Sequence, residues 1–360
     1  MNTFFYPLRE LNEFKEIKQD LTLHHTPIQI TGCIDSQKCH LMAGLSEEQP
    51  FRVIVTYNEL KAKEIYEDFR LYDKNVFLYP AKDIIFYSAD IHGNAIVRER
   101  LHILKRLIKR EPTTIIMTID GGMDRVLPLE TFAPRVITIE EAGVYDLERL
   151  LDDLVLLGYE RVIQVETAGQ FAVRGGILDI FPLTEEAPYR IEFWDDEVDT
   201  IRSFDVESQR SIENVKELSI YPATEFILSE EQLRNGKQKI SDELEQYYAT
   251  LKKDKKLDEA RRIKEIIGEF LERVGEYNGS VAMDSFLHFF HDKTVSFFDY
   301  FSKEDTIFFI DEPMRIDEKA EAVELEFKEG MIGRLESGYI LPSQADAIYS
   351  YKELCIKLEK

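Results

Sequence analysis

The chain has 360 residues, of which 44% are hydrophobic, enough for the cores of two or three domains. Its 69 acidic residues outnumber its 45 basic residues, and the formal net charge of −24 disfavours nucleic-acid binding by this chain alone and favours partners with basic patches. The sequence shows no disulfide framework, no signal peptide and no apolar run of the roughly 20 residues that a membrane helix needs, so we expect a cytoplasmic protein.

Residues 1–119 alternate between helical and strand patterns. Residues 1–22 carry apolar side chains at helical spacing, residues 27–32 are typical of a short buried strand, and residues 39–45 continue as a helix. Apolar strands separated by amphipathic helices are then predicted: strands over 51–57, 75–80 and 113–119, and helices over 58–72 (opened by Asn58) and 95–110. This alternation predicts an α/β domain with a parallel sheet.

The pattern changes near residue 124. A helix is predicted over 145–159, and the apolar residues then nearly alternate in runs separated by glycine or acidic turns, at 161–166, 169–182 and 189–205. These runs predict a compact antiparallel α+β module over 125–210. Two long charged helices follow over 229–279, the first with a capping box at Ser229, and the last predicted elements are a strand over 306–313, a helix, a glycine-containing turn and a closing helix.

The stretch GCIDSQKC (32–39) has the spacing of a phosphate-binding loop. Gly32 and Lys38 fit that motif, but Gln37 replaces the second glycine and Cys39 replaces the Ser or Thr that holds Mg²⁺. Asp35 adds a negative charge where polyphosphate would lie. ATP hydrolysis is therefore disfavoured; a degenerate nucleotide-binding fold and an accidental strand-turn-helix remain as alternatives.

A second acidic motif lies far downstream. The apolar strand FFI (308–310) ends in Asp311 and Glu312, as in a Walker B box, where such acids hold Mg²⁺. Many strands end in acidic turns, so the motif is weak alone and more telling beside the loop at Gly32. The histidines show no spacing that predicts a metal site.

Arginines recur on the predicted antiparallel strands of an otherwise acidic chain: Arg161, Arg174, Arg190 and Arg202. Arg190 and Glu192 are two residues apart, so they should point to the same face of the sheet, while Ile191 and Phe193 point to the core. Charged residues beside aromatic ones are typical of a protein-binding surface. The alternative is a solvated sheet face with cross-strand ion pairs.

Parts of the chain resemble one known family. The stretches 158–182 (GYERVIQVETAGQFAVRGGILDIFP), 189–211 (YRIEFWDDEVDTIRSFDVESQRS) and 219–226 (SIYPATEF) are similar to the N-terminal region of the bacterial transcription-repair coupling factors, the Mfd family. That region is itself similar to the excision-repair helicase UvrB. The stretches TIDGGMDRVLP (118–128) and FFIDEP (308–313) fit the same pattern in the same order.

The resemblance implies a layout of several parts. We expect a degenerate helicase-like α/β domain with a P-loop fold and a parallel sheet over 23–122, with an inserted UvrA-binding α+β module with an antiparallel sheet over 123–212. Residues 1–22 and 213–350 would form a second α/β part with long helices. Residues 351–360 would be a tail or linker to motor domains that this chain lacks.

The resemblance also assigns residues to UvrA binding, where this sequence matches the family motif: Arg161, Arg174, Arg190, Glu192, Phe171 and Phe181, the last two with the core as the alternative. Ala172 departs from UvrB, which has a second arginine there. The span that corresponds to the DNA-inserting hairpin of UvrB, between Pro80 and Asn94, offers only Phe86 and Tyr87. We therefore do not expect this chain to verify DNA damage.

The implied function is a non-catalytic platform that recruits UvrA to stalled RNA polymerase for nucleotide excision repair. RNA polymerase and DNA would be bound by later domains, and ATP and Mg²⁺ would serve the ATP-dependent translocase motor of the full-length family protein, with no cofactor in this chain. The alternative is a UvrB-like ATP-dependent enzyme that separates DNA strands or recognises damage with Lys38, Asp311 and Glu312. A third hypothesis is that a later domain of the whole protein covers the charged sheet face.

Overall fold

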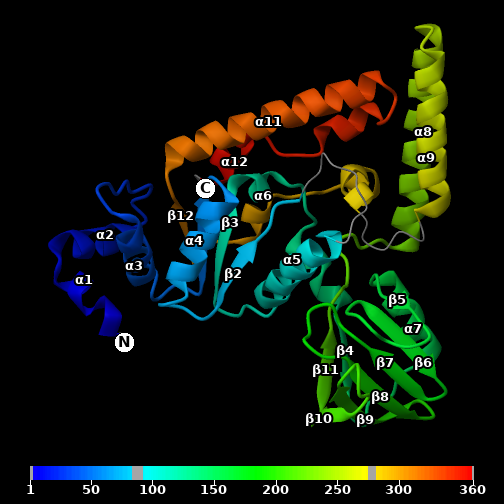
Figure 1. Ribbon diagram of the computed structural model, residues 1–360, viewed down its shortest axis with the longest axis horizontal. Helices are drawn as coiled ribbons and strands as arrows, with labels where there is room; N and C mark the ends of the chain where they lie inside the picture. The colour runs from blue at the N-terminus through cyan, green and yellow to red at the C-terminus, as the bar shows by residue number, and fades with distance from the viewer. Residues whose placement is uncertain (1–2, 83–91, 275–280, 359–360) are drawn as a thin grey trace.

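The computed structural model describes residues 3–82, 92–274 and 281–358, and it contains the parallel sheet and the separate antiparallel module that the sequence predicts (Figure 1). The parallel sheet has the strand order β12-β1-β3-β2. Its strands are β1 (Phe51–Thr56), β2 (Val76–Tyr79), β3 (Thr113–Thr118) and β12 (Thr306–Ile310). The fold class is thus confirmed, and the arrangement is compatible with a helicase-like domain that carries an inserted module.

Both faces of the parallel sheet are buried, which explains its nearly continuous apolar strands. Along β1, Ile54 packs into one core and Val53 and Val55 into another. The Ile54 core includes α3 (Asp35–Leu45) and α4 (Glu59–Phe69). Asn58 caps the first turn of α4, where its side chain accepts a hydrogen bond from the Lys61 backbone. The other core includes α5 (His92–Ile108), α6 (Ile119–Met123), α11 (Pro313–Glu336) and α12 (Tyr351–Leu358).

The strand predicted over residues 27–32 is wrong. This segment has no regular structure, and its side chains are exposed or half-buried. Pro27 lacks a backbone donor, and the polar Gln29 and Thr31 alternate with only two isoleucines, so the segment offers too little apolar surface to join the sheet. The helix predicted over residues 1–22 is also interrupted, because Leu11 is extended between α1 (Tyr6–Glu10) and α2 (Asn12–Thr22).

Two predicted domain assignments need correction. Strand β12 pairs with β1, so residues 306–310 belong to the same parallel sheet as β1, β2 and β3 and not to a second α/β part. Residues 351–358 form α12, whose Leu354 is buried in the core with Val53, so they are not a tail.

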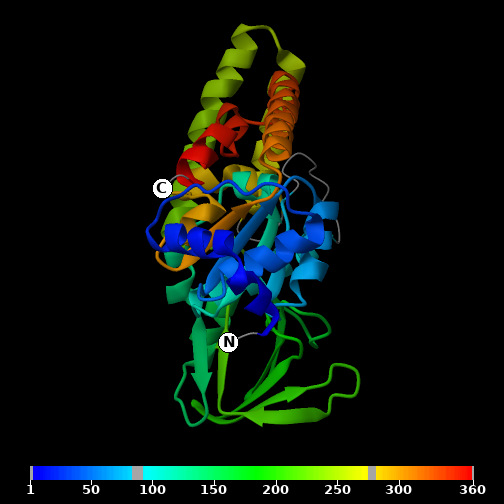
Figure 2. The same ribbon diagram turned by 90° about the vertical axis from the view of Figure 1, so that its left-hand side faces the viewer.

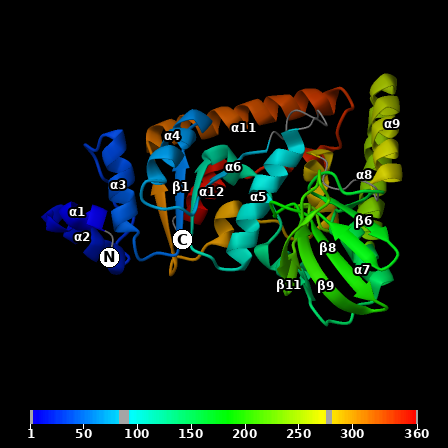
Figure 3. The same ribbon diagram turned by 60° about the horizontal axis from the view of Figure 1, so that its bottom comes forward.

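The antiparallel module lies below the parallel sheet in the views of Figures 1 and 2. Its main sheet has the order β10-β9-β8-β7-β6-β5, and Figure 3 shows β8 beside β9. The six strands are β5 (Glu160–Arg161), β6 (Gln170–Arg174), β7 (Ile177–Ile180), β8 (Tyr189–Trp194), β9 (Glu197–Phe204) and β10 (Ser211–Val215). One face packs on α7 (Leu147–Leu156) and on the ribbon of β4 (Ile137–Glu140) and β11 (Glu217–Ile220).

A pair of long helices forms an arm at the other end of the molecule (Figure 2). These are α8 (Glu230–Lys253) and α9 (Leu257–Arg273), which pack on α10 (Leu287–Phe290). The predicted capping box is confirmed, because Ser229 accepts from the Gln232 backbone and Gln232 accepts from the Ser229 backbone. Short 3-10 turns complete the described elements, at Thr3–Phe5, Leu129–Thr131, Ala133–Arg135, Val281–Phe286, Phe297–Tyr300 and Pro342–Asp346.

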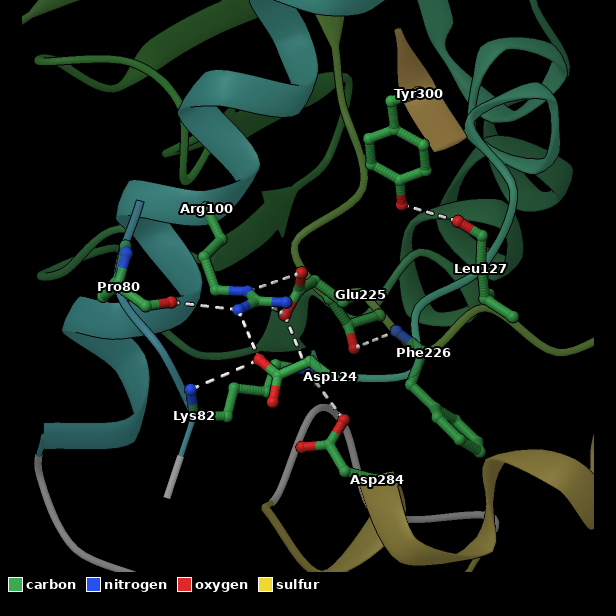
Figure 4. A network of polar contacts seen from close by, with 10 residues as sticks. Pro80, Lys82, Arg100, Asp124, Leu127, Glu225, Phe226, Asp284 and Tyr300 are labelled. Atoms are coloured by element: carbon green, nitrogen blue, oxygen red, sulfur yellow. Dashed lines mark hydrogen bonds and ion pairs between the residues drawn. The ribbon is translucent and has the colours of Figure 1, made fainter. Parts of the chain in front are cut away.

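The module is fixed to the rest of the chain by a buried ionic cluster (Figure 4). Arg100 of α5 is fully buried and binds Asp124, at the start of the segment that enters the module, and Glu225, in the segment that leaves it, at 2.8 and 2.9 Å. Lys82 adds ion pairs of 2.7 Å to Glu225 and to Asp284. Burial raises the pKa of Asp124 to about 6, whereas Arg100 and Lys82, acting against burial, lower the pKa of Glu225 to about 2. One guanidinium therefore anchors both connections.

Candidate functional site

The outer face of the antiparallel sheet carries a ladder of charged side chains. The strand register aligns Ala172, Asp179, Arg190 and Arg202 in one row, and Arg174, Ile177, Glu192 and Thr200 in the next row. Neighbours in a row share a face of the sheet, so these residues point away from α7. The alternate side chains point to the α7 side, where Phe171, Leu178 and Ile191 are fully buried in the core. We call the side of the sheet that carries the two rows the polar face.

Asp179 is the centre of the polar face. Only 2% of this residue is exposed, although it carries a charge. Arg190 donates to both of its carboxylate oxygens, from Nε at 2.6 Å and from Nη2 at 2.8 Å, and Arg174 donates from Nη2 at 3.0 Å. A buried carboxylate without such partners would be strongly destabilising, so these bonds hold the face together.

The two arginines of this cluster are held very differently. The Arg190 guanidinium also donates to Gln209 at 3.0 Å and lies 4.6 Å from the centre of the Phe204 ring. Hydrogen bonding to Asp179 raises the pKa of Arg190, although burial opposes the shift. The Arg174 side chain is 54% exposed, and its contact with Asp179 is its one hydrogen-bonded contact within the described part of the chain. Arg174 therefore keeps N–H donors for a partner, and Arg190 has fewer left.

Glu192 is also paired within the sheet. It accepts from Arg202 and, at 3.3 Å, from Thr200, both on the neighbouring strand β9. The Arg190–Glu192 pair thus shares one face, as the alternation predicts, but each member has its own cross-strand partner. The cross-strand ion pairs of the alternative interpretation are present, and they leave Arg174 as the most open charge of the two rows.

The other predicted contacts do not join this cluster. Arg161 is exposed on β5, where it is paired in register with Phe171 and so belongs to the opposite face, at the edge of the sheet. Phe171 is fully buried in the core, and Phe181 is half-buried just after β7. Ala172, at the position where UvrB has a second arginine, is buried opposite Asp179.

Two residues of the polar face are absent from the predicted set. Asp179 interrupts the apolar strand ILDI (177–180). A carboxylate within a buried strand needs a basic or hydrogen-bonding partner nearby, and this requirement could have identified Asp179 from the sequence. Trp194, the single tryptophan of the chain, ends β8 two residues after Glu192 and is 83% exposed. Tryptophan and arginine are the residue types that most often dominate the binding energy of interfaces.

The structure also brings together the two halves of the predicted nucleotide site. The Lys38 amine lies 2.9 Å from Asp311, 2.5 Å from Glu312 and 3.6 Å from Asp35. Asp311 is nearly fully buried and also accepts from the Thr56 hydroxyl at 3.1 Å. The lysine ammonium is thus paired with the two acids that would hold a divalent cation in a working Walker B box.

The remaining loop residues are used locally. Gly32 adopts a positive φ of 84°, which favours glycine, and the Gln37 side chain accepts from the Ile34 backbone at 3.3 Å as α3 begins. Cys39 is buried, and burial raises the pKa of its thiol to about 12, so it is not a ready metal ligand. In the described residues, no cluster of three or more His, Cys, Asp or Glu side chains could hold a metal ion. Phe86 and Tyr87, from the hairpin comparison, lie outside the described residues.

Comparison with known proteins first defines the class of the module. Residues 137–226 match the family described as the UvrB interaction domain, and this range includes every strand of the polar face.

None of the described helices is long and apolar enough to cross a membrane.

The whole chain then resembles one kind of protein. It is 31% identical over 341 residues to the transcription-repair-coupling factor of Bacillus subtilis (strain 168), a match that covers 93% of this chain. It is 29% identical over 334 residues to that of Staphylococcus epidermidis and 28% identical to that of Staphylococcus aureus (strain USA300), with 92% of this chain covered in each case. The chain spans 28% of the length of these relatives. The resemblance seen in the sequence motifs is thus confirmed.

Proposed function

We propose that this chain is a non-catalytic platform that binds UvrA through the polar face of its antiparallel module. In this proposal it acts as the corresponding region of a transcription-repair-coupling factor and recruits UvrA to stalled RNA polymerase for nucleotide excision repair. RNA polymerase and DNA would be bound by other parts of the longer protein, which would also supply the ATP- and Mg²⁺-dependent translocase motor. This chain itself would need no cofactor.

The observation that carries the proposal is the open side chain of Arg174 within the UvrB interaction domain. Its unused donors would bind an acidic side chain of UvrA, and such a charge-assisted hydrogen bond is stronger than a neutral one. Glu192 and Arg202 would remain paired to each other and would border the contact. Arg161 would add a separate contact at the β5 edge.

A binding titration with a matched control tests the proposal. Arg174→Ala should weaken UvrA binding by at least about tenfold, because it removes a charged contact at the interface, and should change the stability of the chain by less than about 1 kcal/mol. The control is Arg149→Ala, since Arg149 is exposed on α7, on the other side of the sheet. Equal affinities of the wild-type chain and Arg174→Ala would contradict the assignment of the face.

A second candidate is a UvrB-like ATP-dependent enzyme, favoured by the meeting of Lys38 with Asp311 and Glu312 at the strand ends. It would require these ion pairs to open and admit Mg²⁺ with a nucleotide. Equilibrium binding of a fluorescent ATP analogue separates the two functions. Micromolar, Mg²⁺-dependent binding that is lost in Lys38→Ala would support the enzyme, and no saturable binding would support the platform.

A further inference from the structure

The geometry points to Asp179 as a positioning residue of the polar face: together with Arg190 it aims Arg174 at an acidic group of the partner, without touching the partner itself. This inference rests on the proposed UvrA binding for its affinity test. It goes beyond that function by dividing the two arginines into one that makes the contact and one that supports it.

The first argument is burial. Asp179 is 2% exposed, so it lies beneath the surface that a partner can reach. The Arg190 side chain is 17% exposed, and the Arg174 side chain, at 54%, is the most accessible of the three. A partner that docks on the face therefore reaches Arg174 first.

The second argument is the use of hydrogen-bonding capacity. Arg190 binds Asp179 through two of its nitrogens, so its planar fork is fixed in one orientation, and Gln209 and the Phe204 ring fix it further. The second oxygen of Asp179 also accepts from Arg174. Asp179 thus links the exposed Arg174 to the fixed Arg190 through a shared oxygen.

The third argument concerns entropy. An exposed arginine loses side-chain freedom when it binds a partner, and this loss reduces affinity. A side chain that is already held by a buried carboxylate has less freedom to lose, so its contact is stronger. The positive charges of Arg174 and Arg190 would also repel each other, because both guanidinium groups lie within hydrogen-bonding distance of the same carboxylate. The negative charge of Asp179 offsets this repulsion.

The substitution Asp179→Asn tests the inference, because a positioning role and a purely electrostatic role of Asp179 predict opposite changes in UvrA affinity. Asp179→Asn removes a negative charge below the arginines and makes the face more positive. If Asp179 only neutralises charge, this variant should bind an acidic partner more tightly. If Asp179 positions Arg174, the variant should bind UvrA about three- to tenfold more weakly, because Arg174 must then be ordered on binding.

The experiment is a double-mutant cycle in UvrA affinity, with the present chain carrying Asp179→Asn, Arg174→Ala or both. A positioning role predicts that Asp179→Asn weakens binding in the wild-type background and changes it by less than about twofold when Arg174 is already alanine. Additive effects, or tighter binding by Asp179→Asn, would overturn the inference. Should that variant not fold, Arg190→Lys replaces it in the cycle, because lysine keeps the charge but cannot form the fork.

A second readout needs no partner. The Nε–H signal of Arg174 in nuclear magnetic resonance should show a restricted side chain in the wild-type chain and a freely mobile one in Asp179→Asn or Arg190→Lys. Equal mobility in all of these chains would overturn the inference. If the wild-type chain does not bind UvrA, the proposed function fails, and the mobility of Arg174 still decides whether Asp179 positions it.

Discussion

The loop at Lys38 and the polar face at Arg174 both pair a basic residue with a buried carboxylate, but they differ in what is left for a partner. Lys38 is surrounded by Asp311, Glu312 and Asp35, and its side chain is 19% exposed. Within the described residues, the Arg174 side chain makes its one hydrogen bond and ion pair with Asp179, and it is 54% exposed. The charge of the Lys38 ammonium is balanced by the acids around it, whereas the Arg174 guanidinium keeps unused N–H donors after its one contact. We therefore call the Lys38 cluster the closed site and the polar face at Arg174 the open site.

The largest expected effect comes from breaking the support of the open site. Arg190→Ala leaves Asp179 buried with Arg174 as its single charged partner. We expect the free energy of unfolding to fall by about 3 kcal/mol, because an incompletely paired buried carboxylate is costly. Urea denaturation measures this change, with Arg149→Ala as the control. A loss below about 1 kcal/mol would show that Arg174 alone is enough to satisfy Asp179.

A smaller effect is expected at the closed site. Lys38→Met removes the cation beside Asp311, which is nearly fully buried and would keep the Thr56 hydroxyl as its hydrogen-bond donor. The free energy of unfolding should fall by about 2 kcal/mol, while UvrA affinity should not change. Lys63→Met is the matched control, since Lys63 is exposed on α4 in a long ion pair with Glu59. A loss of UvrA binding in Lys38→Met would contradict the separation of the two sites.

The single tryptophan provides a probe of the open site. Because Trp194 lies on the same face as Glu192, UvrA that docks there should change its surroundings. Incorporation of 5-fluorotryptophan gives one fluorine resonance from this chain, which should shift on addition of UvrA. The shift should be absent when the same concentration of UvrA is added to Arg174→Ala. An unshifted resonance at saturating UvrA would place the contact elsewhere, for example at the β5 edge near Arg161.

The smallest expected effect is a dependence of the closed site on pH. Hydrogen bonding to Lys38 lowers the pKa of Glu312 below its usual value of 4.5. A carboxyl group whose pKa is lowered by folding stabilises the fold above pH 4.5, and this contribution is lost as the pH falls through the lowered pKa. Unfolding measured from pH 6 downward should therefore show a small loss of stability that Lys38→Met removes. An identical pH profile in both chains would contradict this pairing.

Much of the fold could be predicted from the sequence because it depends on local patterns. The strands of the parallel sheet are nearly continuous apolar runs, and Ser229 with Gln232 forms a capping box that is visible in four residues. The strand predicted over residues 27–32 is wrong because its two isoleucines, set among polar residues, do not supply the apolar surface that a strand must bury. A phosphate-loop motif therefore predicts the helix that follows it better than the strand before it.

The polar face could be predicted less completely, because the contacts of its residues depend on the register of neighbouring strands. Alternation shows that Arg190 and Glu192 share a face, but the partners of each residue depend on which strand lies alongside. The register of β7 against β6 and β8 is needed to place Asp179 opposite Arg190 and diagonally within reach of Arg174. The register of β5 against β6 assigns Arg161 to the opposite face, which its position in the sequence does not indicate.

The most direct test is one titration of UvrA against this chain, repeated with Arg174→Ala and with Lys38→Ala, in the presence and absence of ATP. The open face predicts binding by the wild-type chain and by Lys38→Ala with the same affinity, and binding at least about tenfold weaker by Arg174→Ala. ATP added to this chain should change none of the three. Equal affinity of Arg174→Ala and the wild-type chain, or loss of binding in Lys38→Ala, would contradict the assignment of function to the polar face.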